Sequence, residues 1–266
     1  IIEAILCPVL FIFSAQAQKF DFYQNNGGLL TVIAGRGFCL LAGDTRMTDG
    51  GYQIYSRNLM RLWGIGTTKM IQLPGIGEES EIDSSAVIGT SGCNSDCFAL
   101  QNFFGYYVKA FNDENCRVLE MPNLAQLLSA ILYSRRGTPY YCFCVVGSIL
   151  QNNGVAYVYD AIGSMEQVAV GTAGTGRELL QPILDRLFAS SSEKDKVVDC
   201  SAEDAVKNVI QAYHSVAERE IGVGDSLVLC LLEQVDGAEK SSEQENFSDT
   251  EDRNQCRLIR IPLKQH

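Results

Sequence analysis

Histidine is almost absent from this sequence. The chain of 266 residues contains two, His214 and His266. Zinc sites are built from cysteine and histidine in recurring pairs, and Cys93 and Cys97, four residues apart, have neither a second cysteine pair nor a histidine nearby. We therefore expect no metal and no cofactor. His214 lies inside an apolar helical pattern and is expected to be a packed side chain rather than a catalytic base.

Positive charge is also scarce, because 21 Lys and Arg stand against 32 Asp and Glu, for a formal net charge of −11. A nucleic-acid partner needs a basic tract that can displace counterions from phosphates, and the sequence has none. Long hydrophobic runs are missing as well. The run Ala4–Phe13 is too short to span a bilayer, so neither nucleic acid nor membrane is expected as a partner.

Cysteine is plentiful, with ten residues, but their spacing indicates no disulfide framework. Four of them lie inside apolar, strand-like runs, where a free thiol behaves as a small hydrophobic side chain: Cys39, Cys142, Cys144 and Cys230. A secreted protein with a signal peptide and disulfides remains an alternative, since Ala15-Gln16-Ala17 resembles a cleavage site. Glu3 and the lack of a basic segment before the apolar run argue against it.

The hydrophobic pattern predicts an α+β protein. Two apolar runs around a short glycine turn, Leu29–Ala34 and Phe38–Gly43, indicate a hairpin, and Ser201 and Asp204 resemble a helix capping box. Further strands are expected at Thr67–Leu73, Ser85–Thr90, Tyr140–Ile149, Val155–Asp160, Met165–Val170, Leu227–Leu232 and Cys256–Ile261, and helices start near Asn94 or Ser95, Pro122, Gly176 and Ser201. This order predicts two stacked antiparallel sheets between two helix layers, a four-layer αββα sandwich.

Three segments are expected to lie outside this regular structure. The stretch Pro74–Ser80, which opens an insertion extending to Ser85, predicts an exposed, acidic turn. The segment Asp236–Asn254 is acidic and without apolar pattern, and predicts a disordered loop between two strands. Gly171–Gly176 has neither P-loop nor dinucleotide-binding spacing, and predicts a tight strand-to-helix turn.

Several motifs resemble those of the β-type subunits of the 20S proteasome core particle. They are Asn26-Gly27-Gly28, Gly43-Asp44-Thr45-Arg46 and Ile131-Leu132-Tyr133-Ser134-Arg135-Arg136. The last of these, with Pro139-Tyr140-Tyr141, is most similar to the non-catalytic type-6 β subunit. The resemblance implies the fold of N-terminal-nucleophile hydrolases, a single domain over residues 19–266 with the acidic insertion at 236–254, and a removable propeptide over residues 1–18.

The same resemblance implies that the catalytic site has been lost. In active subunits an N-terminal threonine attacks the peptide bond, and here that position falls on Gly28, which has no side chain. Asp44 keeps the acidic residue of the second strand, and Arg61 stands at the position of the catalytic lysine. The remaining positions of the site fall on Thr175, Glu220 and Val223. The chain is therefore expected to be an inactive subunit of a threonine-type endopeptidase complex.

The resemblance also implies partners and a place in the cell. We expect a 28-subunit hetero-oligomer of α and β subunits, with type-5 and type-7 β subunits as neighbours, in cytoplasm and nucleus. Asp160 matches an aspartate that reaches the substrate pocket of the adjacent type-5 subunit, although it could equally be a turn residue. An active amidohydrolase using another nucleophile, Cys39 or Thr31, is the alternative within the same fold.

Overall fold

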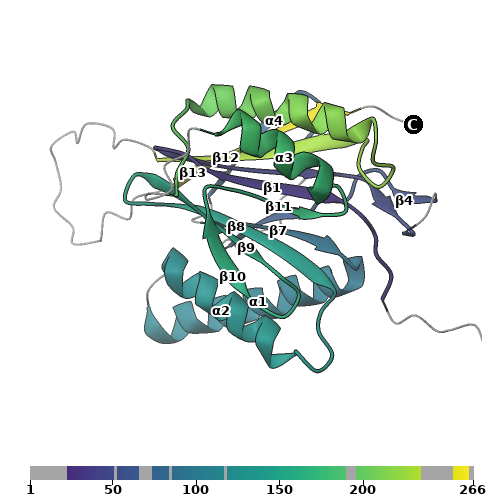
Figure 1. The fold of residues 1–266 in the computed structure, drawn as a ribbon. Coiled ribbons are helices and arrows are strands. Elements are labelled where there is room, and N and C mark those ends of the chain that lie inside the picture. The colour runs from purple at the N-terminus through teal and green to yellow at the C-terminus, as the bar shows by residue number, and fades with distance from the viewer. Residues whose placement is uncertain are drawn as a thin grey trace, which may run out of the picture.

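The computed structural model of this chain describes residues 23–50, 53–65, 74–83, 86–116, 119–189, 196–234 and 254–263. In these residues two stacked antiparallel sheets lie between two pairs of helices (Figure 1). The predicted αββα sandwich is therefore confirmed. No helix within the described ranges is long and apolar enough to cross a bilayer.

The first sheet has six strands and is covered by the helix pair α3 (Arg177–Leu187) and α4 (Ala202–Ala217) (Figure 1). Its strands, from one edge to the other, are β11 (Val170–Gly174), β1 (Leu29–Ala34), β2 (Phe38–Asp44), β12 (Ser226–Gln234), β13 (Asn254–Pro262) and β6 (Glu79–Asp83). The predicted hairpin is the pair β1 and β2. Ser201 caps α4 as predicted, since its Oγ accepts a hydrogen bond from the Asp204 N–H at 3.1 Å.

The second sheet has five strands and is covered by α1 (Asn94–Asn115) and α2 (Met121–Ser134). Its order is β10 (Met165–Val168), β9 (Asn153–Tyr159), β8 (Cys142–Leu150), β7 (Ala86–Gly92) and β5 (Leu62–Ile65). A small hairpin, β3 (Met47–Thr48) and β4 (Ile54–Ser56), lies beside the sandwich.

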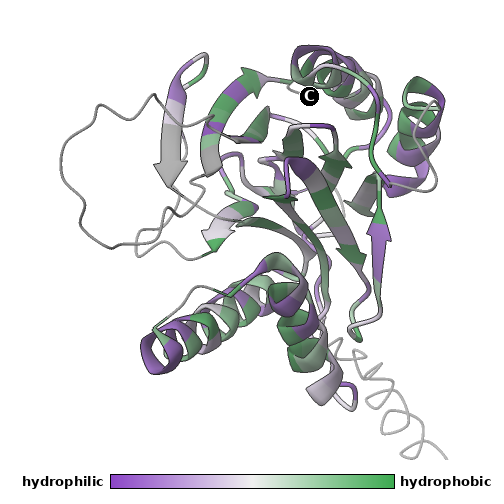
Figure 2. Cartoon of the chain, turned by 90° about the vertical axis from the view of Figure 1, so that its left-hand side faces the viewer, coloured by the Kyte–Doolittle hydropathy of each residue, from purple (hydrophilic) through white to green (hydrophobic). Residues whose placement is uncertain are grey.

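Three apolar layers hold the sandwich together, one between the two sheets and one beneath each helix pair. Successive side chains of a strand point to opposite faces, so Leu29 packs toward α3 and α4 while Leu30 packs between the sheets. This explains why β1 and β2 are apolar in every position rather than in alternate ones. Figure 2 shows mostly hydrophobic residues in the central strands and both kinds along each helix.

Two expectations about turns were right only in part, since Thr175-Gly176 and the exposed Ile76-Gly77 are turns but the neighbouring residues belong to strands. Residues 171–174 belong to β11, which pairs with β1 in the register Leu29↔Gly174, rather than to a turn. The acidic segment after Pro74 continues into β6, an edge strand paired with β13. Charged side chains such as Glu79 are common on edge strands because they discourage pairing with another chain.

Smaller corrections concern one cysteine and one helix cap. Cys230 is not a free thiol, since it forms a disulfide with Cys256 on the adjacent strand, with Cα atoms 6.3 Å apart. Cys39, Cys142 and Cys144 are free and buried as predicted. The α1 helix starts at Asn94 as predicted, and its N-cap is Cys93, so neither Asn94 nor Ser95 caps it. The expected strand at 67–73, the propeptide at 1–18 and the acidic loop, apart from Asn254 in β13, lie outside the described residues.

Candidate functional site

Gly28 lies immediately before β1, at a position where no larger residue fits. Its φ of 103° is in the region that favours glycine. A Cβ atom built on Gly28 would lie 2.1 Å from Cζ of Arg61 and 2.5 Å from its Nε and Nη1. The guanidinium of Arg61 thus fills the space that a side chain at this position would need.

Arg61 is held in this place by buried partners. Its Nε donates to Asp44 Oδ1 at 3.1 Å, and its Nη2 donates to the carbonyl oxygen of Arg46. The Arg61 and Asp44 side chains are 3% and 0% exposed, so displacing the guanidinium would leave a buried carboxylate without its counter-ion.

Asp44 is also tied to the backbone on three sides. Its two oxygens accept hydrogen bonds from the N–H groups of Leu29, Arg46 and Gly224, at 2.9, 3.3 and 3.3 Å. Burial raises the pKa of this carboxyl, while Arg61 and the three N–H groups act in the opposite direction. Asp44 therefore joins β1, β2 and the loop before β12 in one polar cluster.

Two further predicted positions approach Gly28, and one does not. Thr175 donates both its N–H, at 2.9 Å, and its hydroxyl, at 3.3 Å, to the Gly28 carbonyl oxygen. A Cβ on Gly222 would lie 3.2 Å from both Thr175 Oγ1 and Glu220 Oε1, so these two groups flank one backbone position. Val223 is fully buried in the core beneath α3 and α4, and its side chain has a packing role.

Asn26, the first residue of the Asn26-Gly27-Gly28 motif, has a structural role that the motif itself did not indicate. Its N–H donates to the Gly92 carbonyl at 2.9 Å, and its own carbonyl accepts from Thr48 N at 3.1 Å. Its side chain donates to the Thr48 carbonyl at 2.9 Å and accepts from the Asn94 N–H at 2.8 Å. With four hydrogen bonds and 4% exposure, Asn26 fixes the chain upstream of Gly28 between β3 and the start of α1.

A second buried ion pair supports the loop that carries Glu220 and Val223. Arg46 Nε donates to Asp225 Oδ2 at 2.9 Å, and Arg46 Nη1 donates to the Ile221 carbonyl at 3.0 Å. Arg57 also pairs with Asp225. The side chain of Arg46 therefore positions residues 221–225. It does not face Gly28, Asp44 and Arg61, which we call the Gly28 cluster.

Comparisons with known proteins identify this arrangement. The family model described as "Proteasome subunit" matches residues 76–232. A relative named "Proteasome subunit beta type-1" from Dictyostelium discoideum is 35% identical over 219 residues, covering 81% of this chain and 86% of the relative. The protein of the same name from Arabidopsis thaliana is 33% identical, covering 79% and 89%. The chain belongs to the proteasome β-subunit family.

The comparisons do not single out one type of β subunit. A relative named "Probable proteasome subunit beta type-6" from Encephalitozoon cuniculi is 27% identical, covering 82% of this chain and 68% of the relative. The type-1 relatives are thus more similar to this β subunit than the type-6 relative is, and the likeness to type-6 subunits stays a prediction.

Cys39 and Thr31, the alternative nucleophiles, both lie inside strands of the first sheet and are fully buried. Burial raises the pKa of the Cys39 thiol to about 12, so it is protonated at neutral pH, and the thiolate is the reactive form. The Thr31 hydroxyl lies 3.2 Å from the Tyr213 hydroxyl. Neither group is accessible to a peptide substrate.

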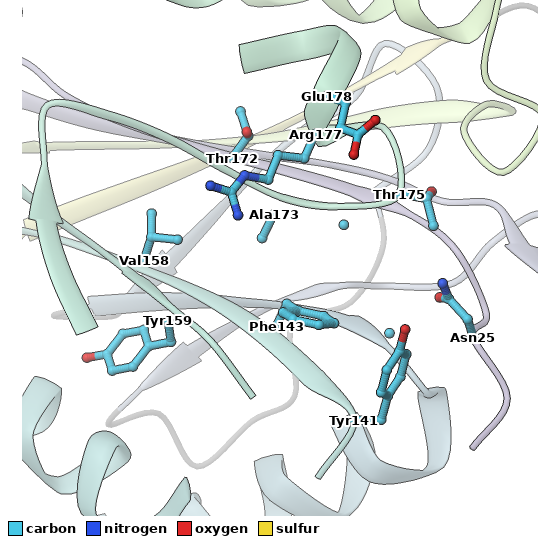
Figure 3. Close-up of a pocket in the computed structure, with 12 residues that line it drawn as sticks. Asn25, Tyr141, Phe143, Val158, Tyr159, Thr172, Ala173, Thr175, Arg177 and Glu178 are labelled. Atoms are coloured by element: carbon cyan, nitrogen blue, oxygen red, sulfur yellow. The ribbon is translucent and has the colours of Figure 1, made fainter. Parts of the chain in front are cut away.

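A pocket of about 290 Å³ opens beside the Gly28 cluster (Figure 3). Thr175 connects the two, because it lines the pocket and bonds to the Gly28 carbonyl. The other walls come from β8, β9, β11, the start of α3 and the segment before β1. They include Asn25, Tyr141, Phe143, Val158, Arg177 and Glu178.

Asp160 lies in the turn between β9 and β10. Its Oδ1 accepts hydrogen bonds from the N–H groups of Ile162, at 3.0 Å, and Ser164, at 2.7 Å. The first of these is the bond to the backbone two residues on that a turn-forming aspartate makes. Asp160 is therefore a turn residue in this chain, and its side chain is only partly buried.

Proposed function

We propose that this β subunit is a non-catalytic, structural member of the 20S proteasome β ring. In this role it supports assembly and lines neighbouring active sites during ATP- and ubiquitin-dependent protein degradation. The observation that carries the proposal is the place of the Arg61 guanidinium in the space where a side chain at position 28 would lie.

The chemistry of the family's reaction supports this role. An N-terminal hydroxyl nucleophile needs a free α-amine as its general base. Here the residue at that position is glycine, and the chain upstream of it is held by the four hydrogen bonds of Asn26. The guanidinium of Arg61 has only donor N–H groups and its Nε is engaged with Asp44, so it cannot replace a base.

An active-site probe tests the proposal. Proteasomes that contain this chain are treated with a peptide epoxyketone, which reacts with a hydroxyl and a free amine together, and the subunits are analysed by mass spectrometry. We expect adducts on the catalytic β subunits, which serve as the internal control, and none on this chain. An adduct at Gly28, or at any other N-terminus of this chain, would overturn the proposal.

We further propose that the mature subunit keeps the segment around Asn26 and that a neighbouring active subunit removes the propeptide, residues 1–18. The burial of Asn26 supports this, because cleavage between Gly27 and Gly28 would free a segment that contributes four hydrogen bonds. N-terminal sequencing of the subunit from assembled particles is expected to begin near Gln18 or Lys19. A start at Gly28 would contradict both this proposal and the inactive role.

Membership of the family implies assembly with other proteasome subunits. Beyond that, we propose a type-6-like position between type-5 and type-7 β subunits of a 28-subunit particle in cytoplasm and nucleus. Native mass spectrometry of the endogenous complex, followed by cross-linking of adjacent subunits, tests the stoichiometry and the neighbours. Cross-links to other β types alone would reassign the position.

A further inference from the structure

A cation, the guanidinium of the exposed residue Arg177, lines the pocket beside the Gly28 cluster. Arg177 begins α3, and Figure 3 shows its guanidinium pointing into the pocket, beside Ala173 and above Val158 and Phe143. Across the described ranges, no carboxylate pairs with it. Glu178, the adjacent residue, lies at the upper rim and points away from the guanidinium in the same view. The unpaired charge therefore faces the cavity.

The other polar groups of the pocket leave few donors for a ligand. The Thr172 hydroxyl donates to Gln181 Oε1 at 2.7 Å, and the Thr175 hydroxyl donates to the Gly28 carbonyl. Asn25 uses its Oδ1 to accept the Gly27 N–H at 3.0 Å, which leaves its amide NH₂ for the pocket. The donors on offer are thus the Arg177 guanidinium at one end of the pocket and the Asn25 amide and Tyr141 hydroxyl at the other, and the guanidinium is the group that suits an oxyanion.

The opposite wall is aromatic. The rings of Tyr141 and Phe143 lie edge to face with centroids 5.5 Å apart, and Val158 continues this side. A volume of about 290 Å³ is at the lower end of the usual range for ligand pockets, about 300–1,000 Å³. The cavity suits one or two residues of a peptide rather than a long ligand.

We propose that this pocket binds the free C-terminal carboxylate of a peptide that ends in an aromatic or large aliphatic residue. The carboxylate pairs with Arg177, and the terminal side chain packs on Val158 and Phe143 below it. The inference rests on the proposed function, because a subunit without a nucleophile can hold a peptide end without cleaving it. The ligands in that setting are peptides already released by catalytic subunits.

Glu178 lowers the affinity of the same site for a carboxylate. Its carboxylate lines the rim and repels a ligand carboxylate by Coulomb interaction, which weakens binding without abolishing it. Glu178→Gln removes this charge at nearly constant size and is expected to tighten binding of the free acid. It should not alter binding of the corresponding amide, which has no charge to repel.

The test uses proteasomes containing this chain and a short peptide whose C-terminal residue is photoreactive benzoylphenylalanine, in two forms, free acid and amide. After irradiation, labelled sites on this chain are mapped by mass spectrometry. We expect the acid to label the chain within residues 141–178, at concentrations about tenfold lower than the amide requires. Arg177→Gln should weaken labelling by the acid about tenfold and leave the amide unchanged.

Arg186→Gln is the matched control, since Arg186 is an exposed arginine on the same helix and does not line the pocket. The Arg186→Gln variant should be labelled by the acid and by the amide to the same extent as the unaltered chain. Equal labelling by acid and amide, equal effects of the two Arg variants, or labels only outside the pocket would each overturn the proposal. Because the readout is binding, such a result leaves the inactive role standing, and an epoxyketone adduct would refute that role without bearing on Arg177.

Discussion

Two residues that face each other, Gly28 and Arg61, explain why a side chain at position 28 would destabilise the fold. A methyl group on Gly28 would have to displace the Arg61 guanidinium. The residue that carries it would also have to adopt a backbone conformation that costs L-residues about 1–2 kcal/mol. Breaking a buried ion pair costs about 3–5 kcal/mol, because one charge is left uncompensated. Gly28→Ala is therefore expected to lower the free energy of unfolding by at least about 3 kcal/mol, measured by denaturant titration.

Gly105→Ala is the control for this prediction. Gly105 is an exposed glycine in the middle of α1, and a Cβ built there would meet nothing within 4 Å. Alanine stabilises a helix interior by about 0.5–1 kcal/mol relative to glycine, so this variant should be slightly more stable. If Gly28→Ala behaved like Gly105→Ala, the tight packing of Arg61 against position 28 would be refuted.

Cys39 gives a pH prediction at the same scale. Burial raises the pKa of its thiol from 9.0 to about 12, so about one molecule in ten thousand carries the thiolate at pH 8. The folded state holds this proton to higher pH than the unfolded chain does. The resulting stability is complete below pH about 9 and is lost as the pH rises through about 12.

Alkylation tests whether the Cys39 thiol is unreactive in the folded protein and reactive in the unfolded chain. Native protein treated with iodoacetamide at pH 8 should be modified at the exposed Cys116 and not at Cys39, with both sites modified after denaturation. Peptide mass spectrometry gives the two extents separately. Comparable native rates at Cys39 and Cys116 would show an accessible, reactive thiol and would revive Cys39 as a nucleophile.

Among the elements, α4 is the one whose start is specified by a single side chain. Ser201→Ala removes the acceptor of the Asp204 N–H and should lower the free energy of unfolding by about 1 kcal/mol. Ser215→Ala, on an exposed position of the same helix where the hydroxyl bonds back to the Gln211 carbonyl, should change it by less than about 0.5 kcal/mol. Thermal or denaturant unfolding of both variants compares them. Equal effects would mean that the cap does not stabilise α4.

Local patterns also explain which elements the sequence could predict. The β1–β2 hairpin and the four helices follow from the spacing of apolar residues over short windows. The strand β11 does not, because Gly171-Thr172-Ala173-Gly174 has no apolar alternation and is a strand only through its pairing with β1, more than a hundred residues earlier. The edge strand β6 likewise depends on β13, a partner that a local pattern cannot reveal.

The features of the candidate site also fall into two groups, those that spacing along the sequence predicts and those that depend on tertiary neighbours. Gly28, Asp44 and Arg61 could be found because the family's spacing along one hairpin and its next segment places them. The motif also includes Asn26, but its role could not be predicted, since its partners at positions 48, 92 and 94 come from two segments distant in the sequence. The inward orientation of Arg177 and the disulfide between Cys230 and Cys256 also depend on tertiary neighbours.

At the scale of the whole molecule, exposed aromatic residues fit a chain that assembles with others. Phe98, Tyr106 and Tyr107 of α1 are 55%, 68% and 42% exposed, and such clusters on a surface mark interaction sites more often than free surface. In an assembled particle, a residue that stabilises a turn of its own subunit can also act on a neighbour, and Asp160 is the residue for which we propose this.

Asp160→Asn separates its two roles. Asparagine keeps an oxygen that can accept from the Ile162 and Ser164 N–H groups, so the turn, and with it assembly, should be unchanged. It removes a negative charge, which on our proposal faces the substrate pocket of an adjacent type-5 subunit and attracts basic or polar substrate groups. We expect the active site of the adjacent type-5 subunit to lose about 0.5–1 kcal/mol of preference for a lysine over a norleucine at that subsite, which is about two- to fivefold in kcat/KM. Asp113→Asn, an exposed charge change on α1, should leave the ratio unaltered. An intact particle in which Asp160→Asn gives the same ratio as Asp113→Asn would show that Asp160 only forms its turn.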